Sequence, residues 1–125
     1  MLDGNVYLPS LAAAAQRQAR ATQGVGGPVV VGISYPTDEL KTCMARRTLD
    51  LKLRRPSRPA WPGDDISPEH FGDADAFLEG VVSEVLLPVP QRVAIDAART
   101  ALWGHSFADL CVLHAMLTRP SAFRT

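Results

Sequence analysis

Residues 99–117 (RTALWGHSFADLCVLHAML) combine a short apolar stretch, a group of small and polar residues, and a second apolar stretch. Arg99–Trp103 is short and mostly apolar, which favours a buried strand. Phe107–Leu117 carries apolar residues at helical spacing, and Arg119-Pro120 would end that helix. This part of the chain therefore predicts a strand, a tight turn and a helix, with Ser106 in the turn.

Ser106 lies between two small residues, Gly104 and Ala108, and has His105 and Phe107 beside it. Gly-x-Ser-x-small between a strand and a helix is typical of a nucleophile elbow, in which larger neighbours would clash with the strand and helix. The start of the helix also offers unpaired N–H groups and a favourable dipole. The residues leave one alternative open, a serine that only caps an ordinary helix.

The segments before this stretch alternate between helix and strand patterns. Val6–Ala21 is Ala-rich with one apolar face, which predicts an amphipathic helix. After the Gly-rich turn 23–27, Pro28–Ser34 is a β-branched apolar run, typical of a strand buried on both faces of a parallel sheet. Thr37–Leu49 predicts a short helix.

The middle of the chain is a long excursion over residues 35–71, in which the prolines of Arg54–Gly63 predict irregular backbone. Gly72–Leu87 predicts the clearest helix, because its apolar residues form an unbroken i, i+4 stripe. Strands alternating with helices predict an α/β fold with a parallel sheet, in a single domain spanning residues 1–125.

Composition narrows the class of protein. With 46% apolar residues, the 125-residue chain can form a core, and its 13 acidic and 13 basic residues argue against a nucleic-acid partner. Cys43 and Cys111 predict neither a zinc site nor a disulfide framework, and Cys111 is expected in the core. No apolar run approaches the ~18 residues of a membrane span, and Met1–Ala15 lacks a basic leader region. We expect a cytoplasmic protein without a membrane partner, metal or cofactor.

Residues 103–107 (WGHSF) and 112–120 (VLHAMLTRP) resemble the elbow and following helix of an esterase family of α/β hydrolases, in its branch of enterobactin- and salmochelin-type siderophore esterases. Residues 1–5 (MLDGN) resemble that family's strand end and oxyanion loop. Tyr35-Pro36, residues 46–50 and residues 73–77 follow in the expected order, so the resemblance covers nearly the whole chain.

The resemblance implies roles for individual positions. Ser106 would be the acyl-forming nucleophile, in an elbow made with Gly104, His105 and Ala108. The backbone N–H groups of Phe107 and Asn5 would form the oxyanion hole, which stabilises charge on the substrate carbonyl oxygen. The segment around Arg46 and Arg47 would lie near the substrate mouth.

Two positions depart from the family pattern. Asp109 stands where the family has a glycine, and its carboxylate would oppose an oxyanion if it faced the site. The family's Asp-Tyr-Thr-Pro run is replaced here by residues 50–53 (DLKL).

The catalytic acid and base are also missing from their expected place. In α/β hydrolases they follow the serine in the chain, but the 19 residues after Ser106 hold only His114 and, as a carboxylate, Asp109. His114 lies roughly 12 Å along the helix, out of hydrogen-bond reach, and neither His105 nor His70 is placed to act as base.

The expected structure is thus a partial α/β-hydrolase domain of about three parallel strands with flanking helices in three layers. Open sheet edges could then allow self-association.

We expect a fragment of a serine esterase that acts on a small-molecule carboxylic ester, such as a siderophore ester. One alternative is a non-catalytic, truncated hydrolase-like protein. The other is a small interaction module that uses the basic stretch Lys41–Arg58. Whether the chain is itself an enzyme stays open.

Overall fold

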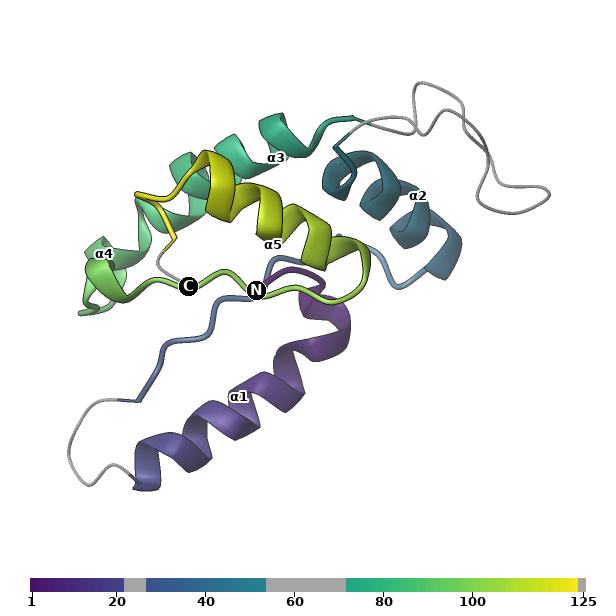
Figure 1. The fold of residues 1–125 in the computed structure, drawn as a ribbon. Coiled ribbons are helices and arrows are strands. Elements are labelled where there is room, and N and C mark those ends of the chain that lie inside the picture. The colour runs from purple at the N-terminus through teal and green to yellow at the C-terminus, as the bar shows by residue number, and fades with distance from the viewer. Residues whose placement is uncertain (22–26, 54–71, 124–125) are drawn as a thin grey trace.

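A computed structural model describes residues 1–21, 27–53 and 72–123. The helical elements are α1 (Gly4–Ala21), α2 (Leu40–Leu51), α3 (Ala74–Gly80), the π-helix η2 (Val81–Leu86), α4 (Val89–Arg92), the 3₁₀-helix η3 (Ala97–Arg99) and α5 (Phe107–Thr118). Helices α2, α3 and α5 pack on one another, whereas α1 extends away from them in the view of Figure 1.

The predicted α/β fold, with about three parallel strands in three layers, is wrong for the part of the chain that the structure describes: no residue there forms a strand. The segments predicted as strands share a few hydrogen bonds with residues 1–4, among them one from the Met1 amino group to Val31 O at 2.7 Å. Ile33 N–H donates to Met1 O (2.9 Å), Gly4 N–H to Ile33 O (2.8 Å) and Leu2 N–H to Trp103 O (2.9 Å).

The backbone at Asp3 explains why the pairing of residues 1–4 with the neighbouring segments extends over so few residues. Asp3 has a positive φ of 55°, which turns the chain out of the extended direction, and α1 begins at the next residue. Along Pro28–Ser34, Val29 and Val31 remain 48% and 36% exposed, so the expected burial on both faces is also absent. Arg99 ends η3 instead of starting a strand.

The helix predictions hold better than the strand predictions. The helix expected over Gly72–Leu87 is present as α3 followed by η2, and Leu87 N–H donates to Val82 O, five residues back. The predicted turn at 23–27 and the irregular Arg54–Gly63 fall wholly or largely outside the described residues.

The core gathers residues from both ends of the chain. Its largest fully buried side chains are Leu2, Leu51, Leu78 and Cys111. The residues of α5 that are fully buried in this core are small. Cys111 is buried as expected, and burial raises the pKa of its thiol to about 11. This core brings the start of α1, the C-terminal part of α2 and the N-terminus of α5 together.

Candidate functional site

Ser106 occupies a strained backbone conformation at the start of α5. Its φ is 60° and its ψ is −117°, a region that non-glycine residues rarely adopt, and it is the N-cap residue of the helix. A Cβ on Gly104 would lie 2.6 Å from the carbonyl carbon and oxygen of Ala108. The tight turn predicted from Gly104, Ser106 and Ala108 is therefore present, with its small residues in close contact.

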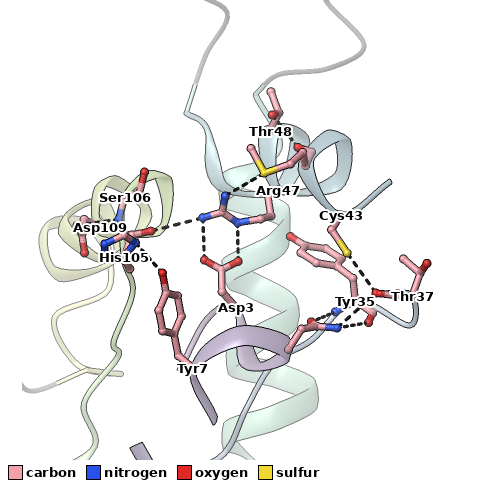
Figure 2. Close-up of polar contacts among 12 residues, drawn as sticks. Asp3, Tyr7, Tyr35, Thr37, Cys43, Arg47, Thr48, His105, Ser106 and Asp109 are labelled. Atoms are coloured by element: carbon pink, nitrogen blue, oxygen red, sulfur yellow. Dashed lines mark hydrogen bonds and ion pairs between the residues drawn. The ribbon is translucent and has the colours of Figure 1, made fainter. Parts of the chain in front are cut away.

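The side chain of Asp109 takes part in the cap of the same helix. Its Oδ2 accepts a hydrogen bond from the Ser106 N–H at 3.0 Å, which satisfies an amide that the helix leaves without a partner. Figure 2 shows Asp109 beside Ser106. The carboxylate that replaces the family's glycine thus has a structural partner at the turn.

Asn5 lies in the first turn of α1, just after the turn at Asp3. Its side chain holds residues 35–37: Nδ2 donates to Tyr35 O at 3.0 Å and Oδ1 accepts from Tyr35 N–H at 2.9 Å. The amide side chain is therefore occupied by backbone groups. Because the backbone N–H of Asn5 lies in the first helical turn, it has no acceptor within the helix.

Asn5 and Ser106 line the same open cavity of about 460 Å³. Phe107 is not among the residues that line it. The other lining residues are Asp3, Val6, Tyr7, Tyr35, Thr37, Asp38, Leu40, Cys43, Met44, Arg47 and His105. The structure thus brings three of the predicted site residues, Asn5, His105 and Ser106, to one cavity.

Sequence reasoning missed the ion pair between Asp3 and Arg47, which Figure 2 shows at the centre of this region. Arg47 Nε and Nη2 donate to the two carboxylate oxygens of Asp3 at 2.6 and 2.8 Å, although Asp3 is only 7% exposed. The hydrogen bond that Arg47 donates to Asp3 raises the pKa of Arg47. The family resemblance placed the segment around Arg46 and Arg47 near the substrate mouth but assigned neither residue a contact.

The ring of Phe107 lies under two cations. The Cζ of Arg47 is 5.7 Å from the ring centroid and the Nζ of Lys52 is 4.5 Å from it, distances at which a ring face attracts positive charge. This contact joins the residue after Ser106 to the C-terminal part of α2.

Tyr35, which lines the cavity, forms a second polar pair with Asp50. Burial and the nearby Asp50 carboxylate raise the pKa of Tyr35 well above its usual range. Burial also raises the pKa of Asp50, against the lowering effect of its hydrogen bond with Tyr35. Asp50, which keeps the first residue of the family's Asp-Tyr-Thr-Pro run, is therefore half-buried and paired with Tyr35.

The two histidines that the structure describes have partners other than Ser106. His105 Nδ1 lies 2.9 Å from the hydroxyl of Tyr7, and His114 Nε2 lies 2.9 Å from Oδ1 of Asp75 on α3. His70 lies outside the described residues. Within the described ranges, neither histidine therefore has Ser106 as its hydrogen-bond partner.

Within residues 1–21, 27–53 and 72–123, no group of three or more His, Cys, Asp or Glu side chains could hold a metal ion. None of the helices described here has the length and apolar character needed to cross a membrane.

Comparison with known proteins identifies relatives of one kind, although no family model matches the sequence. The chain is 35% identical over 124 residues to the siderophore triacetylfusarinine C esterase of Aspergillus fumigatus, covering 98% of this chain and 39% of that protein. It is 31% identical over 127 residues to the ferri-bacillibactin esterase BesA of Bacillus subtilis, covering 100% of this chain and 44% of that protein.

Solved structures agree with these relatives. The siderophore hydrolase EstA from Aspergillus nidulans matches with a TM-score of 0.80 and 32% identity, over 98% of this chain and 41% of that one. The BES protein from Bacillus cereus matches with a TM-score of 0.77 and 26% identity, over 98% of this chain and 47% of that one. The chain spans less than half the length of each of these proteins.

The resemblance carried by residues 103–107 and 1–5 is thereby confirmed. The chain is a relative of the siderophore esterases over nearly its whole length, and it corresponds to about two fifths of theirs.

Proposed function

We propose that this chain carries the nucleophile and the oxyanion hole of a serine esterase that cleaves carboxylic esters, those of siderophores in particular. Ser106 Oγ would attack the ester carbonyl, forming an acyl-enzyme and releasing the alcohol, and water would then release the acid. The backbone N–H groups of Asn5 and Phe107 would stabilise the tetrahedral oxyanion.

One observation carries the proposal: a serine with φ of 60° stands at the N-terminus of α5, on the wall of a cavity that Asn5 also lines. Strained backbone of this kind persists only where the surrounding structure imposes it, and it concentrates at functional sites. The names of the relatives support the choice of siderophore esters as substrates.

Catalysis also needs a general base within about 2.6–3.2 Å of the serine hydroxyl. Because His105 and His114 have other partners, the proposal assigns the base to a group outside the described residues. The same observation supports a second candidate function, a hydrolase-like protein that binds an ester without cleaving it.

Hydrolysis assays with the Ser106→Ala variant test the proposal. We expect the parent chain to hydrolyse p-nitrophenyl acetate and an iron-loaded siderophore triester, and Ser106→Ala to reduce the rate by at least about a hundredfold. A fluorophosphonate probe should label the parent chain at Ser106 alone. The matched control is Ser10→Ala, an exposed serine of α1, which should keep the parent rate.

The outcomes separate the two candidates. Equal rates for the parent chain and Ser106→Ala would reject the esterase proposal. Binding of the siderophore ester without Ser106-dependent hydrolysis would favour the non-catalytic candidate. Hydrolysis of p-nitrophenyl acetate but not of the siderophore ester would retain the nucleophile and reject the substrate class.

A further inference from the structure

Arg47 contacts both segments that would build the proposed oxyanion hole. It lies on α2, yet its guanidinium reaches Asp3 before α1, the backbone of His105 and the ring of Phe107. These partners are 44 to 60 residues away in the sequence. A single side chain therefore connects the Asn5 segment with the Ser106 turn, as Figure 2 shows for Asp3, Arg47 and His105.

The contact with Asp3 orients the first turn of α1. The carbonyl oxygen of Asp3 accepts from the N–H groups of Val6 and Tyr7 at 3.0 and 3.2 Å, so Asp3 holds the start of the helix. Its carboxylate is held in turn by the two-point ion pair with Arg47. A bidentate Arg–carboxylate pair fixes orientation as well as distance. The direction of the Asn5 N–H, within that first turn, follows from the position of Asp3.

The same guanidinium that binds Asp3 also contacts the Ser106 turn. Nη2 donates to His105 O at 3.5 Å, and the guanidinium lies over the Phe107 ring. The carbonyl of His105 and the N–H of Phe107 flank Ser106. Movement of Arg47 would therefore change the direction in which the Phe107 N–H points. The side chain of Arg47 is only 15% exposed, and Nη1 faces Met44 Sδ at 3.5 Å.

We propose that Arg47 is a positioning residue, which holds the N–H groups of Asn5 and Phe107 at the spacing that one oxyanion requires. The inference rests on the proposed function. Arg47 acts through Asp3, His105 and Phe107 and not as a substrate contact, because its Nε and Nη2 already donate to Asp3 and His105. Lysine could keep the charge beside Asp3, but it lacks the planar fork that reaches both segments.

The first test is the kinetics of Arg47→Lys in the full chain. We expect kcat for p-nitrophenyl acetate to fall by about tenfold to a hundredfold with KM changed by less than about twofold, because misaligned donors weaken only transition-state binding. A raised KM with unchanged kcat would make Arg47 a substrate contact and overturn the inference. Unchanged kcat and KM would overturn it as well.

The second test uses NMR and needs no catalysis. The backbone amide resonances of Asn5 and Phe107 should both shift in Arg47→Lys, and that of Phe107 should shift in Asp3→Asn although Asp3 acts only through Arg47. The double variant should show shifts smaller than the sum of the single ones, as coupled positions do. Additive shifts, or a Phe107 resonance that does not shift in Asp3→Asn, would overturn the inference.

The design separates failure of the inference from failure of the proposed function. If Ser106→Ala and the parent chain hydrolyse esters equally, the proposed function fails, and the NMR test decides on Arg47 alone. If Arg47→Lys does not fold, the inference is tested by whether the backbone amide resonance of Phe107 shifts in Asp3→Asn. The matched control is Arg17→Lys, an exposed arginine within α1 outside the cavity, which should leave kcat and both resonances unchanged.

Discussion

At the scale of single residues, the turn at Ser106 depends on how closely Gly104 approaches α5. Ser106 is held at a φ that costs on the order of 1–3 kcal/mol, and the contact between Gly104 and Ala108 leaves no room for a side chain. The Asp109 carboxylate adds a hydrogen bond to the N–H of Ser106. The contact of Gly104 with Ala108 and the hydrogen bond from Ser106 to Asp109 therefore stabilise the strained backbone at Ser106.

Substituting Gly104 by alanine should disturb this turn. A Cβ there would lie 2.7 Å from the Cβ of Ala108 and 2.6 Å from its carbonyl group, so the backbone must shift. We expect Gly104→Ala to lower the free energy of unfolding by about 1–3 kcal/mol, in the range of overpacked sites. Urea unfolding followed by circular dichroism measures this change.

Gly80 in α3 provides the matched control, because a Cβ there would meet no atom within 4 Å. Gly80→Ala should raise the free energy of unfolding by about 0.5–1 kcal/mol through its higher helix propensity. Equal effects of the two substitutions would contradict the steric explanation of the turn.

At the scale of elements, a polar cluster joins α3 to α5 on the side away from Ser106. Oδ1 of Asp75 on α3 lies 2.9 Å from His114 Nε2 and accepts a hydrogen bond from Arg119 Nη1 at 3.1 Å. Arg119 Nη2 donates to the backbone carbonyl of Asp75 at 3.0 Å. These hydrogen bonds, that of His114 first, lower the pKa of Asp75. His114 thus links two helices, two turns beyond the serine.

This cluster predicts an acid dependence of stability. Because the folded pKa of Asp75 lies below its ordinary value of 3.8, the contribution is present above that pH. It is lost as the pH falls through the lower folded pKa. Below pH 3.8, the free energy of unfolding should therefore decrease less steeply with falling pH in Asp75→Asn than in the parent chain. The effect should be small, because this carboxylate is exposed to solvent.

Urea unfolding at a series of pH values between about 2 and 6 measures this dependence. Glu84→Gln, an exposed carboxylate of η2 outside the cluster, is the control and should keep the parent slope. A slope for Asp75→Asn equal to that of the parent would show that the cluster is not linked to folding.

At the scale of the whole molecule, one core connects elements from residue 2 to residue 123. Leu2, Leu51, Leu78, Leu102 and Phe123 belong to the same buried cluster. A cluster that includes α2, α3 and α5 should make these helices unfold together. Self-association of the chain stays a prediction, but sheet edges cannot mediate it among residues that form no strand.

Leu78 tests this single core, because it is 0% exposed. We expect Leu78→Ala to lower the free energy of unfolding by about 2–5 kcal/mol, in one cooperative transition, because its cavity lies where α3 meets the rest of the core. Leu117→Ala, at a side chain that is 75% exposed on α5, is the control and should change stability by less than about 0.5 kcal/mol.

Urea unfolding followed by circular dichroism and by amide resonances of α2 and α5 measures both variants. Separate transitions for the two helices in the parent chain would contradict the single core.

The local sequence alone determined the helices, the turn at Ser106 and the family. Helical spacing in residues 72–87 and 107–117, and the small residues at 104 and 108, act over a few positions, so they leave a readable pattern. Whether Pro28–Ser34 and Arg99–Trp103 become strands depends on partners elsewhere in the chain, and there the prediction was wrong. Only the tertiary structure could show that Arg47 meets Asp3, because a contact across 44 residues has no local signal.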